Sequence, residues 1–198
     1  RTSSGMRTVT GSCYVPILVR VLVAKAYRLK LYPNAETRQD FLRFSGACRW
    51  LWNHLLALNI ETYKATGRFI FRYEMSKLLP GLKEQYPWLT EVPSGSLQQV
   101  CAYLDRALKR SFKPDASGKK AGFPQFKEYA GPRSFYIPNN KMRIEGNKVV
   151  LPKVGAVKFR SGRLPEGKIL GATVKLEGND WYCTIQCQVE LDVQPVEP

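Results

Sequence analysis

Residues 25–41 read KAYRLKLYPNAETRQDF, and this stretch contains the change from a strand pattern to a helix pattern. Before the proline, small or charged residues alternate with apolar ones, which is the period of a strand with one buried face. Pro33 ends the strand, because proline has no backbone N–H to donate. Asn34 is a favoured helix cap, and Glu36 follows in the first turn, where its charge favours the helix dipole. We therefore expect a strand over 23–32, followed by a helix.

Two helices are expected after this cap. In the first, apolar side chains recur every three or four residues up to about Tyr63, and Gly67 then ends the pattern. A shorter helix is expected over residues 73–84, broken near Pro80, because proline removes one helical hydrogen bond and crowds the preceding turn.

A third helix is expected after Pro93, with Ser94 or Ser96 as its cap. One face has the spacing of a buried stripe and consists of Leu97, Val100, Cys101, Leu104, Leu108 and Phe112. The outer stripe combines an amide, an aromatic ring and three cations, namely Gln99, Tyr103, Arg106, Arg110 and Lys113. A phosphate backbone that followed this helix would meet a line of hydrogen-bond donors.

From Arg133 onward the period of the pattern changes from near 3.6 to two. Six strands are expected at residues 133–138, 141–145, 148–151, 154–160, 168–176 and 181–191. Together with the early strand they predict an α+β fold, in which an antiparallel β-barrel is interrupted by a helical insertion. The insertion spans roughly residues 34–129.

The chain is strongly basic. Its 198 residues include 31 Lys and Arg against 16 Asp and Glu, a formal net charge of +15. Solubility alone needs a net charge of only about 2 to 8 in a small domain. The excess is local, because seven cations between Arg106 and Lys127 face one acid, Asp115. Such a field attracts polyanions and favours a nucleic-acid partner.

Residues with catalytic or metal-binding chemistry are scarce. The five cysteines are widely spaced without a CxxC pair, which fits neither a zinc ribbon nor a secreted disulfide framework and favours a reducing, cytoplasmic setting. We interpret Cys183 and Cys187 as core residues, since they share one strand face. His54 is the one histidine, and no phosphate-binding glycine loop or acid cluster is present. Residues 1–22 are interpreted as an N-terminal extension, and no segment predicts a membrane span.

The motifs resemble the TnpB (OrfB) proteins of bacterial insertion sequences, which are relatives of type V CRISPR effectors. KAYRLKLYPNAETRQDF resembles the family's first strand and helix start. CRWLWNHLL, with Arg49, Trp50, Trp52 and Asn53, resembles its R-F-x-Y-N segment. The segments GFPQFK, SFYIPNN, IEGNKVVLPKVGAVKFR and GATVKLEGNDWYCTIQCQVEL follow in the family's order.

The resemblance implies a wedge domain, which is an oligonucleotide-binding-like barrel at residues 23–33 and 130–191, interrupted by a helical recognition lobe at 34–129. Its partners would be a transposon-derived guide RNA and double-stranded target DNA, which carries a short transposon-adjacent motif. Candidate readers of that motif are Tyr73, Ser76, Ser94, Gln98, Asn139 and Asn140. Candidate contacts to the RNA or heteroduplex backbone are Arg49, Asn53, Arg106, Lys109, Arg110, Lys113, Lys119, Lys120 and Lys127. Gly95 stands where relatives often have a bulkier residue.

In the family, the last strand leads into a D-x-G motif with the first RuvC-like catalytic carboxylate, whereas here residues 192–198 read DVQPVEP. We therefore expect no catalytic residue, no metal site and no cofactor in this chain. Mg²⁺ and zinc would belong to C-terminal domains of relatives, and a separate nuclease half is a possible partner. Bacterial cytoplasm, near the nucleoid, is the expected location. The alternative is a stand-alone, helix-turn-helix DNA-binding regulator that needs no RNA.

Overall fold

The computed structural model describes residues 19–114, 117–138 and 141–193. The described residues form three α-helices, one short 3₁₀ helix and one seven-stranded antiparallel sheet, with all the helices between the first and second strands. The helices are α1 (Ala35–Thr66), α2 (Arg72–Gln85), η1 (Pro87–Glu91) and α3 (Ser94–Phe112). The strands are β1 (Val19–Tyr32), β2 (Ser134–Pro138), β3 (Arg143–Glu145), β4 (Lys148–Leu151), β5 (Gly155–Arg160), β6 (Lys168–Glu177) and β7 (Asp180–Val193).

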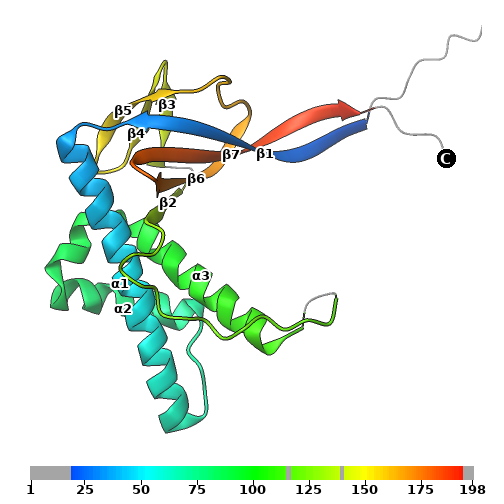
Figure 1. Cartoon of the computed structure of the whole chain (residues 1–198). Helices are drawn as coiled ribbons and strands as arrows, with labels where there is room; N and C mark the ends of the chain where they lie inside the picture. Colours follow the sequence, from blue (N-terminus) through cyan, green and yellow to red (C-terminus); the bar gives the residue numbers. More distant parts are fainter. Residues whose placement is uncertain (1–18, 115–116, 139–140, 194–198) are drawn as a thin grey trace, which may run out of the picture.

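The sheet has the order β2-β6-β7-β1-β5-β4-β3 and curls into a half-barrel above the helices (Figure 1). The expected α+β class and the six expected C-terminal strands are confirmed, each within a few residues of its predicted bounds. Two edges of the half-barrel are formed by short strands, β2 and β3. The α1 helix begins directly after β1, so the sheet fixes the starting point of the helical layer.

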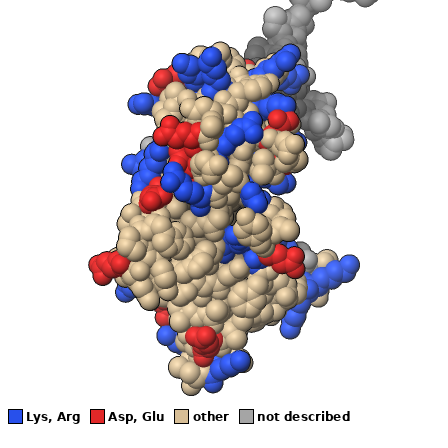
Figure 2. Space-filling model, turned by 60° about the vertical axis from the view of Figure 1, so that its left-hand side comes forward, with Lys and Arg blue, Asp and Glu red and all other residues tan. Residues whose placement is uncertain are grey.

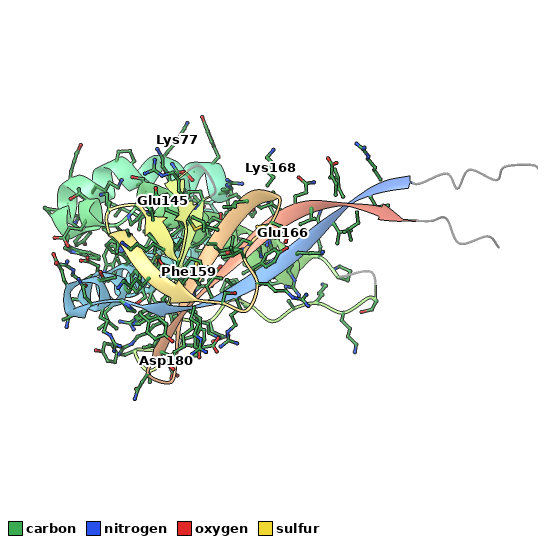
Figure 3. The ribbon with its side chains drawn as sticks, turned by 90° about the horizontal axis from the view of Figure 1, so that it is seen from above. Lys77, Glu145, Phe159, Glu166, Lys168 and Asp180 are labelled. Atoms are coloured by element: carbon green, nitrogen blue, oxygen red, sulfur yellow. The ribbon has the colours of Figure 1, made fainter. Side chains whose placement is uncertain are left out.

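β1 is longer than the sequence pattern predicts. It begins at Val19 rather than near residue 23, and it pairs with β7 from Val19 opposite Val193 to Leu31 opposite Trp181. Because β6 pairs with β7 only as far as Gln188, the far ends of β1 and β7 form a two-stranded ribbon that projects from the body (Figure 1). Seen from above, Glu166 and Lys168 lie near the base of this ribbon, and Asp180 lies at the opposite end of the sheet (Figure 3).

α1 has the ends that the sequence predicts. The Asn34 side chain accepts a hydrogen bond from the Thr37 N–H at 2.8 Å, and so satisfies one backbone donor of the first turn. Gly67 ends the helix in the left-handed conformation, at φ 70°, and its N–H donates to the Tyr63 carbonyl. The helix between these caps is 32 residues long.

Two local predictions for the other helices are wrong. α2 continues through Pro80 instead of breaking there, because Met75, Leu79 and Leu82 are buried and hold both halves of the helix in the core. α3 begins after Pro93 without a side-chain cap. Ser96 does not cap it, because its hydroxyl donates across to the Tyr136 carbonyl of β2 at 2.5 Å.

One core joins the helices to the sheet. The Phe41 ring on α1 is fully buried, with its centroid 5.0 Å from that of Trp181 on β7 and 5.5 Å from that of Phe135 on β2. Cys183 and Cys187 are buried, free thiols, which confirms their interpretation as core residues. Because these side chains belong to one cluster, the sheet fixes the helices in place.

Candidate nucleic-acid interface

α3 is positioned by its apolar face. Five of the six residues expected to be buried are buried: Leu97, Val100, Cys101, Leu104 and Leu108. The sixth, Phe112, has 41% of its surface exposed. α3 packs against α1, α2 and β2, so its opposite stripe is the side that a ligand can reach.

The C-terminal half of α3 forms one wall of an open cavity of about 480 Å³, which we call the cation cavity. Its other walls come from the start of α2 and from the segment after α3. Its charged lining consists of Arg72, Asp105, Arg106, Lys109, Arg110, Lys113, Lys119 and Lys120. Seven cations therefore share one hollow with a single carboxylate, and the hollow has the electrostatic character of a polyanion site.

Asp105 holds one wall of the cation cavity together. Its carboxylate accepts a hydrogen bond from the Arg72 N–H at 3.1 Å, at the first residue of α2, and another from the Lys109 ammonium at 2.9 Å. Its side chain is largely buried. Among the described residues, Arg106, Arg110 and Lys113 form no ion pair, so their charges stay available for an anionic ligand.

Six of the nine predicted backbone-contacting residues line the cation cavity: Arg106, Lys109, Arg110, Lys113, Lys119 and Lys120. Of the remaining three, Arg49 and Asn53 lie on α1, which does not line the cavity, and Lys127 contacts α1. There, residues 121–129, which we call the strap, run from the end of α3 toward β2 and cross α1 (Figure 1).

These three residues fasten the strap. Asn53 donates from Nδ2 to the Lys127 carbonyl at 3.0 Å and accepts from the Lys127 N–H at 2.8 Å. Arg49 donates to the Tyr129 carbonyl at 3.1 Å, and its guanidinium lies 4.8 Å from the centre of the Tyr129 ring. Lys127 lies over the Trp52 ring at 4.2 Å, and burial there lowers its pKa. The R-F-x-Y-N-like segment thus has a structural task, while its predicted RNA contacts stay a prediction.

Tyr73 and Ser76 line a smaller cavity of about 340 Å³ that shares Arg72, Asp105 and Lys109 with the cation cavity. Tyr73 is 72% exposed. Two of the predicted motif readers therefore adjoin the cations.

Ser94 and Gln98 lie in the first turns of α3, and both are exposed. The Ser94 hydroxyl accepts a hydrogen bond from Lys83 at 2.9 Å. Gly95 lies against the end of β2: a Cβ added there would approach the Pro138 ring to 2.6 Å, far inside van der Waals contact. The first turn of α3 therefore lies close to the end of β2. Asn139 and Asn140 themselves lie outside the described residues.

Sequence reasoning missed Arg72 and Asp105. Arg72 was outside the helix predicted over residues 73–84, although it is the first residue of α2. Asp105 falls at the helical spacing of the α3 core face, beside Cys101 and Leu108, and an acid on such a face signals a buried partner.

Charged residues are unevenly distributed over the molecule. Figure 2 shows few charged side chains over much of the helical half of one face, whereas Lys, Arg, Asp and Glu gather over the sheet half. Several sheet cations are paired: Arg28 with Glu177, and Lys30 with Asp180. These sheet cations have acidic partners, whereas in the cation cavity seven cations share one hollow with a single carboxylate.

Within 19–114, 117–138 and 141–193, no three His, Cys, Asp or Glu residues are grouped closely enough to hold a metal ion. In the same ranges, no helix has the length and apolar character that crossing a membrane requires.

Comparisons with known proteins agree with the motifs. Residues 23–68 match the family model of IS605-type OrfB proteins that is described as "Helix-turn-helix domain". In the structure these residues are most of β1 and the whole of α1, which is one continuous helix. An Escherichia coli (strain K12) protein named "Putative RNA-guided DNA endonuclease InsQ" is 32% identical over 177 residues. The match covers 88% of this chain and 42% of that relative, so the chain spans less than half of the relative's length. The chain belongs to the TnpB/OrfB family of insertion-sequence proteins.

Proposed function

We propose that this chain is the guide-RNA and target-DNA binding portion of a TnpB-like RNA-guided DNA endonuclease. The observation that carries the proposal is the cation cavity, where seven cations from α2, α3 and the segment after α3 face one acid. Side chains with fixed positive charge and many donors suit phosphate oxygens. The printed name of the E. coli relative, an RNA-guided DNA endonuclease, supports the two partners.

Within this proposal, the cation cavity holds the phosphate backbone of the guide RNA or of its heteroduplex with the target. Arg106, Arg110 and Lys113 make the contacts, because no described acid neutralises them. Arg49, Asn53 and Lys127 contribute by fastening the strap, which continues from the cavity wall. These contacts recognise the charge and shape of the nucleic-acid backbone, whereas base pairing with the guide RNA recognises the target sequence.

The transposon-adjacent motif is read at the other end of α3. Gln98 is exposed there, near Ser94 and the end of β2, and a carboxamide can pair in a bidentate manner with adenine. Tyr73 and Ser76, which line the smaller cavity beside the cation cavity, belong to the same proposed set. Asn139 and Asn140 complete the proposed set. The curled sheet serves as the wedge, with an oligonucleotide-binding-like role, and the helices serve as the recognition lobe.

Cleavage belongs, in this proposal, to a RuvC-like domain of the longer family proteins, together with their Mg²⁺ and zinc. The described residues of this chain offer no metal-binding cluster, so they do not fit such a group. The chain's own task is to bind and orient nucleic acid. Its proposed location is the bacterial cytoplasm, at the nucleoid.

Co-purification tests the proposal. The full chain is expressed together with its transposon end, and the RNA that purifies with it is sequenced. We expect stoichiometric RNA from the transposon end, and binding of duplex DNA that depends on this RNA. A chain that binds neither RNA nor DNA at physiological ionic strength would contradict the proposal. Strand cleavage by the purified chain with Mg²⁺ would contradict the assignment of cleavage to another domain.

A stand-alone sequence-specific DNA-binding regulator is the second candidate. The helix-turn-helix description of the matched family model favours it. A chain that purifies without RNA and still prefers particular short duplexes would support the regulator.

A further inference from the structure

An exposed aromatic cluster lies at the end of α1, and the functions described so far do not use it. Its centre is Phe69, whose ring stacks on Tyr63 with centroids 4.4 Å apart and planes 16° from parallel. Phe112 and Phe123 pack against the same ring at 4.9 and 6.1 Å. Tyr63, Phe112 and Phe123 are 49%, 41% and 38% exposed, so the cluster leaves much aromatic surface open to solvent.

This aromatic cluster adjoins the cation cavity. Phe112 directly precedes Lys113, and Phe123 follows Ala121 by two residues, while Lys113 and Ala121 both line the cavity. The two segments are joined, because the Ala121 N–H donates to the Arg110 carbonyl at 3.3 Å. A ligand whose phosphates occupy the cavity therefore has aromatic rings within reach of its bases.

We propose that the aromatic cluster stacks unpaired bases of the RNA whose phosphates occupy the cation cavity. This inference rests on the proposed function and adds the chemical class of nucleotide at the site. A duplex keeps its bases stacked on one another, whereas a single strand offers base faces to aromatic side chains. RNA is the ligand because proteins recognise it mainly at unpaired loops and bulges, while the target DNA enters as a duplex.

The aromatic cluster differs from a second exposed aromatic group in the positive charge that lies beside it. Trp88 on η1 is 40% exposed and packs edge-on against Trp50, which stacks on His54. None of these three residues lines the cation cavity. Aromatic exposure is thus present in both groups, but of the two groups it is the one with Phe112 and Phe123 that adjoins the cation cavity. Trp88 provides a matched control.

The test uses the full 198-residue chain and four labelled probes: a single-stranded RNA with 2-aminopurine at one central position, the same RNA as a duplex, and the matching DNA single strand and duplex. The variant F112L/F123L keeps apolar volume and removes the aromatic faces. We expect it to bind the single-stranded RNA at least about 5-fold more weakly, within the range measured for lost base stacking, and to bind both duplexes like the wild type. We also expect the wild type to quench 2-aminopurine, and the variant to lose that quenching.

The control W88L should bind all four probes like the wild type. If W88L showed the same loss, or if F112L/F123L lost duplex affinity equally, the effect would be general destabilisation and the inference would be wrong. Stacking alone would weaken binding of the DNA single strand as well, so RNA as the ligand would be overturned if the wild type bound the DNA single strand more tightly than the RNA single strand. If F112L/F123L bound the single-stranded RNA and quenched 2-aminopurine like the wild type, while R106Q/R110Q/K113Q bound all four probes more weakly, base stacking would be refuted and the proposed function would stand. If R106Q/R110Q/K113Q bound all four probes like the wild type, the proposed function itself would be wrong.

Discussion

The side chain of Asn53 forms two hydrogen bonds with the backbone of Lys127, a residue 74 positions later in the chain. One bond runs from Nδ2 to the Lys127 carbonyl at 3.0 Å and the other from the Lys127 N–H to Oδ1 at 2.8 Å. Trp52 adds a bond from its indole N–H to the Gln125 carbonyl at 3.0 Å. The strap has no regular secondary structure, so α1 side chains supply partners for its backbone groups.

Replacement of Asn53 by alanine is expected to lower the free energy of unfolding by about 1–2 kcal/mol, because both backbone groups of Lys127 lose their partner. Faster hydrogen exchange of the Lys127 amide should accompany the loss. Gln98→Ala is the control, since it removes an exposed carboxamide from another helix and should change stability by less than about 0.5 kcal/mol. Equal stability of the two variants in urea titrations would show that the Asn53 bonds do not hold the strap.

Gly95→Ala is expected to destabilise the fold by about 1–3 kcal/mol, because the new methyl group would lie 2.6 Å from the Pro138 ring. Gly46→Ala is the matched control. A Cβ at residue 46 has nothing within 4 Å, and alanine in a helix interior should stabilise by about 0.5–1 kcal/mol. Thermal melting of both variants measures the difference. A Gly95→Ala variant that melted at or above the wild-type temperature would contradict the close approach of α3 to β2.

Burial raises the pKa of the Cys48 thiol from 9.0 to about 12. The unfolded chain therefore loses this proton first, and Cys48 makes the free energy of unfolding fall as the pH rises from about 9 toward 12. Urea titrations at pH 8, 9 and 10 measure the fall. In Cys48→Ala the free energy of unfolding should fall less steeply with pH, by up to about 1.4 kcal/mol per pH unit above pH 9. Equal slopes for the wild type and Cys48→Ala would show that the thiol titrates normally.

Replacement of Arg106, Arg110 and Lys113 by glutamine should weaken binding to RNA and DNA of all sequences. The slope of log K against log salt should flatten by up to about 0.9 for each lost phosphate contact on duplex DNA.

The matched control removes three cations that already have acidic partners, by Lys30→Gln, Arg43→Gln and Lys175→Gln. Both triple variants lower the net charge equally. Fluorescence anisotropy at several salt concentrations should show a large effect for the cavity variant and a small one for the control. Equal effects would mean that net charge, rather than the cation cavity, governs binding.

Gln98→Ala should change the preference among short adjacent motifs while leaving RNA binding unchanged. The reason is that an exposed carboxamide reads base edges, whereas cations bind the backbone. Binding to a library of duplexes that differ only in the motif measures this preference. A uniform loss across the library would assign Gln98 to the backbone instead.

The elements that the sequence predicts best are those with local causes. The α1 cap at Asn34 and its end at Gly67 follow from side chains within one turn of each terminus. The strands of the sheet follow from the two-residue period, and most apolar residues of the expected α3 face are buried. The predictions that were wrong, the break at Pro80 and the Ser96 cap, both used a local rule that distant packing overrides.

The candidate site likewise has a part that the sequence predicts and a part that it does not. The sequence shows that cations are concentrated between Arg106 and Lys127, and six of them do meet in one cavity. It could not show that Arg72 would join them through Asp105, or that Arg49 and Asn53 would hold the strap. Those arrangements depend on how α2 and the strap pack against α3 and α1.

The sequence by itself determined the order and type of the elements, the faces that are buried, and the excess of positive charge around α3, because each depends on residue spacing within one segment. The tertiary structure alone decided which cations share a cavity, which side chains fasten the strap, and that Phe112 and Phe123 lie beside one ring. The physical reason is that contacts between residues many positions apart are set by packing of the common core, and no local period encodes them.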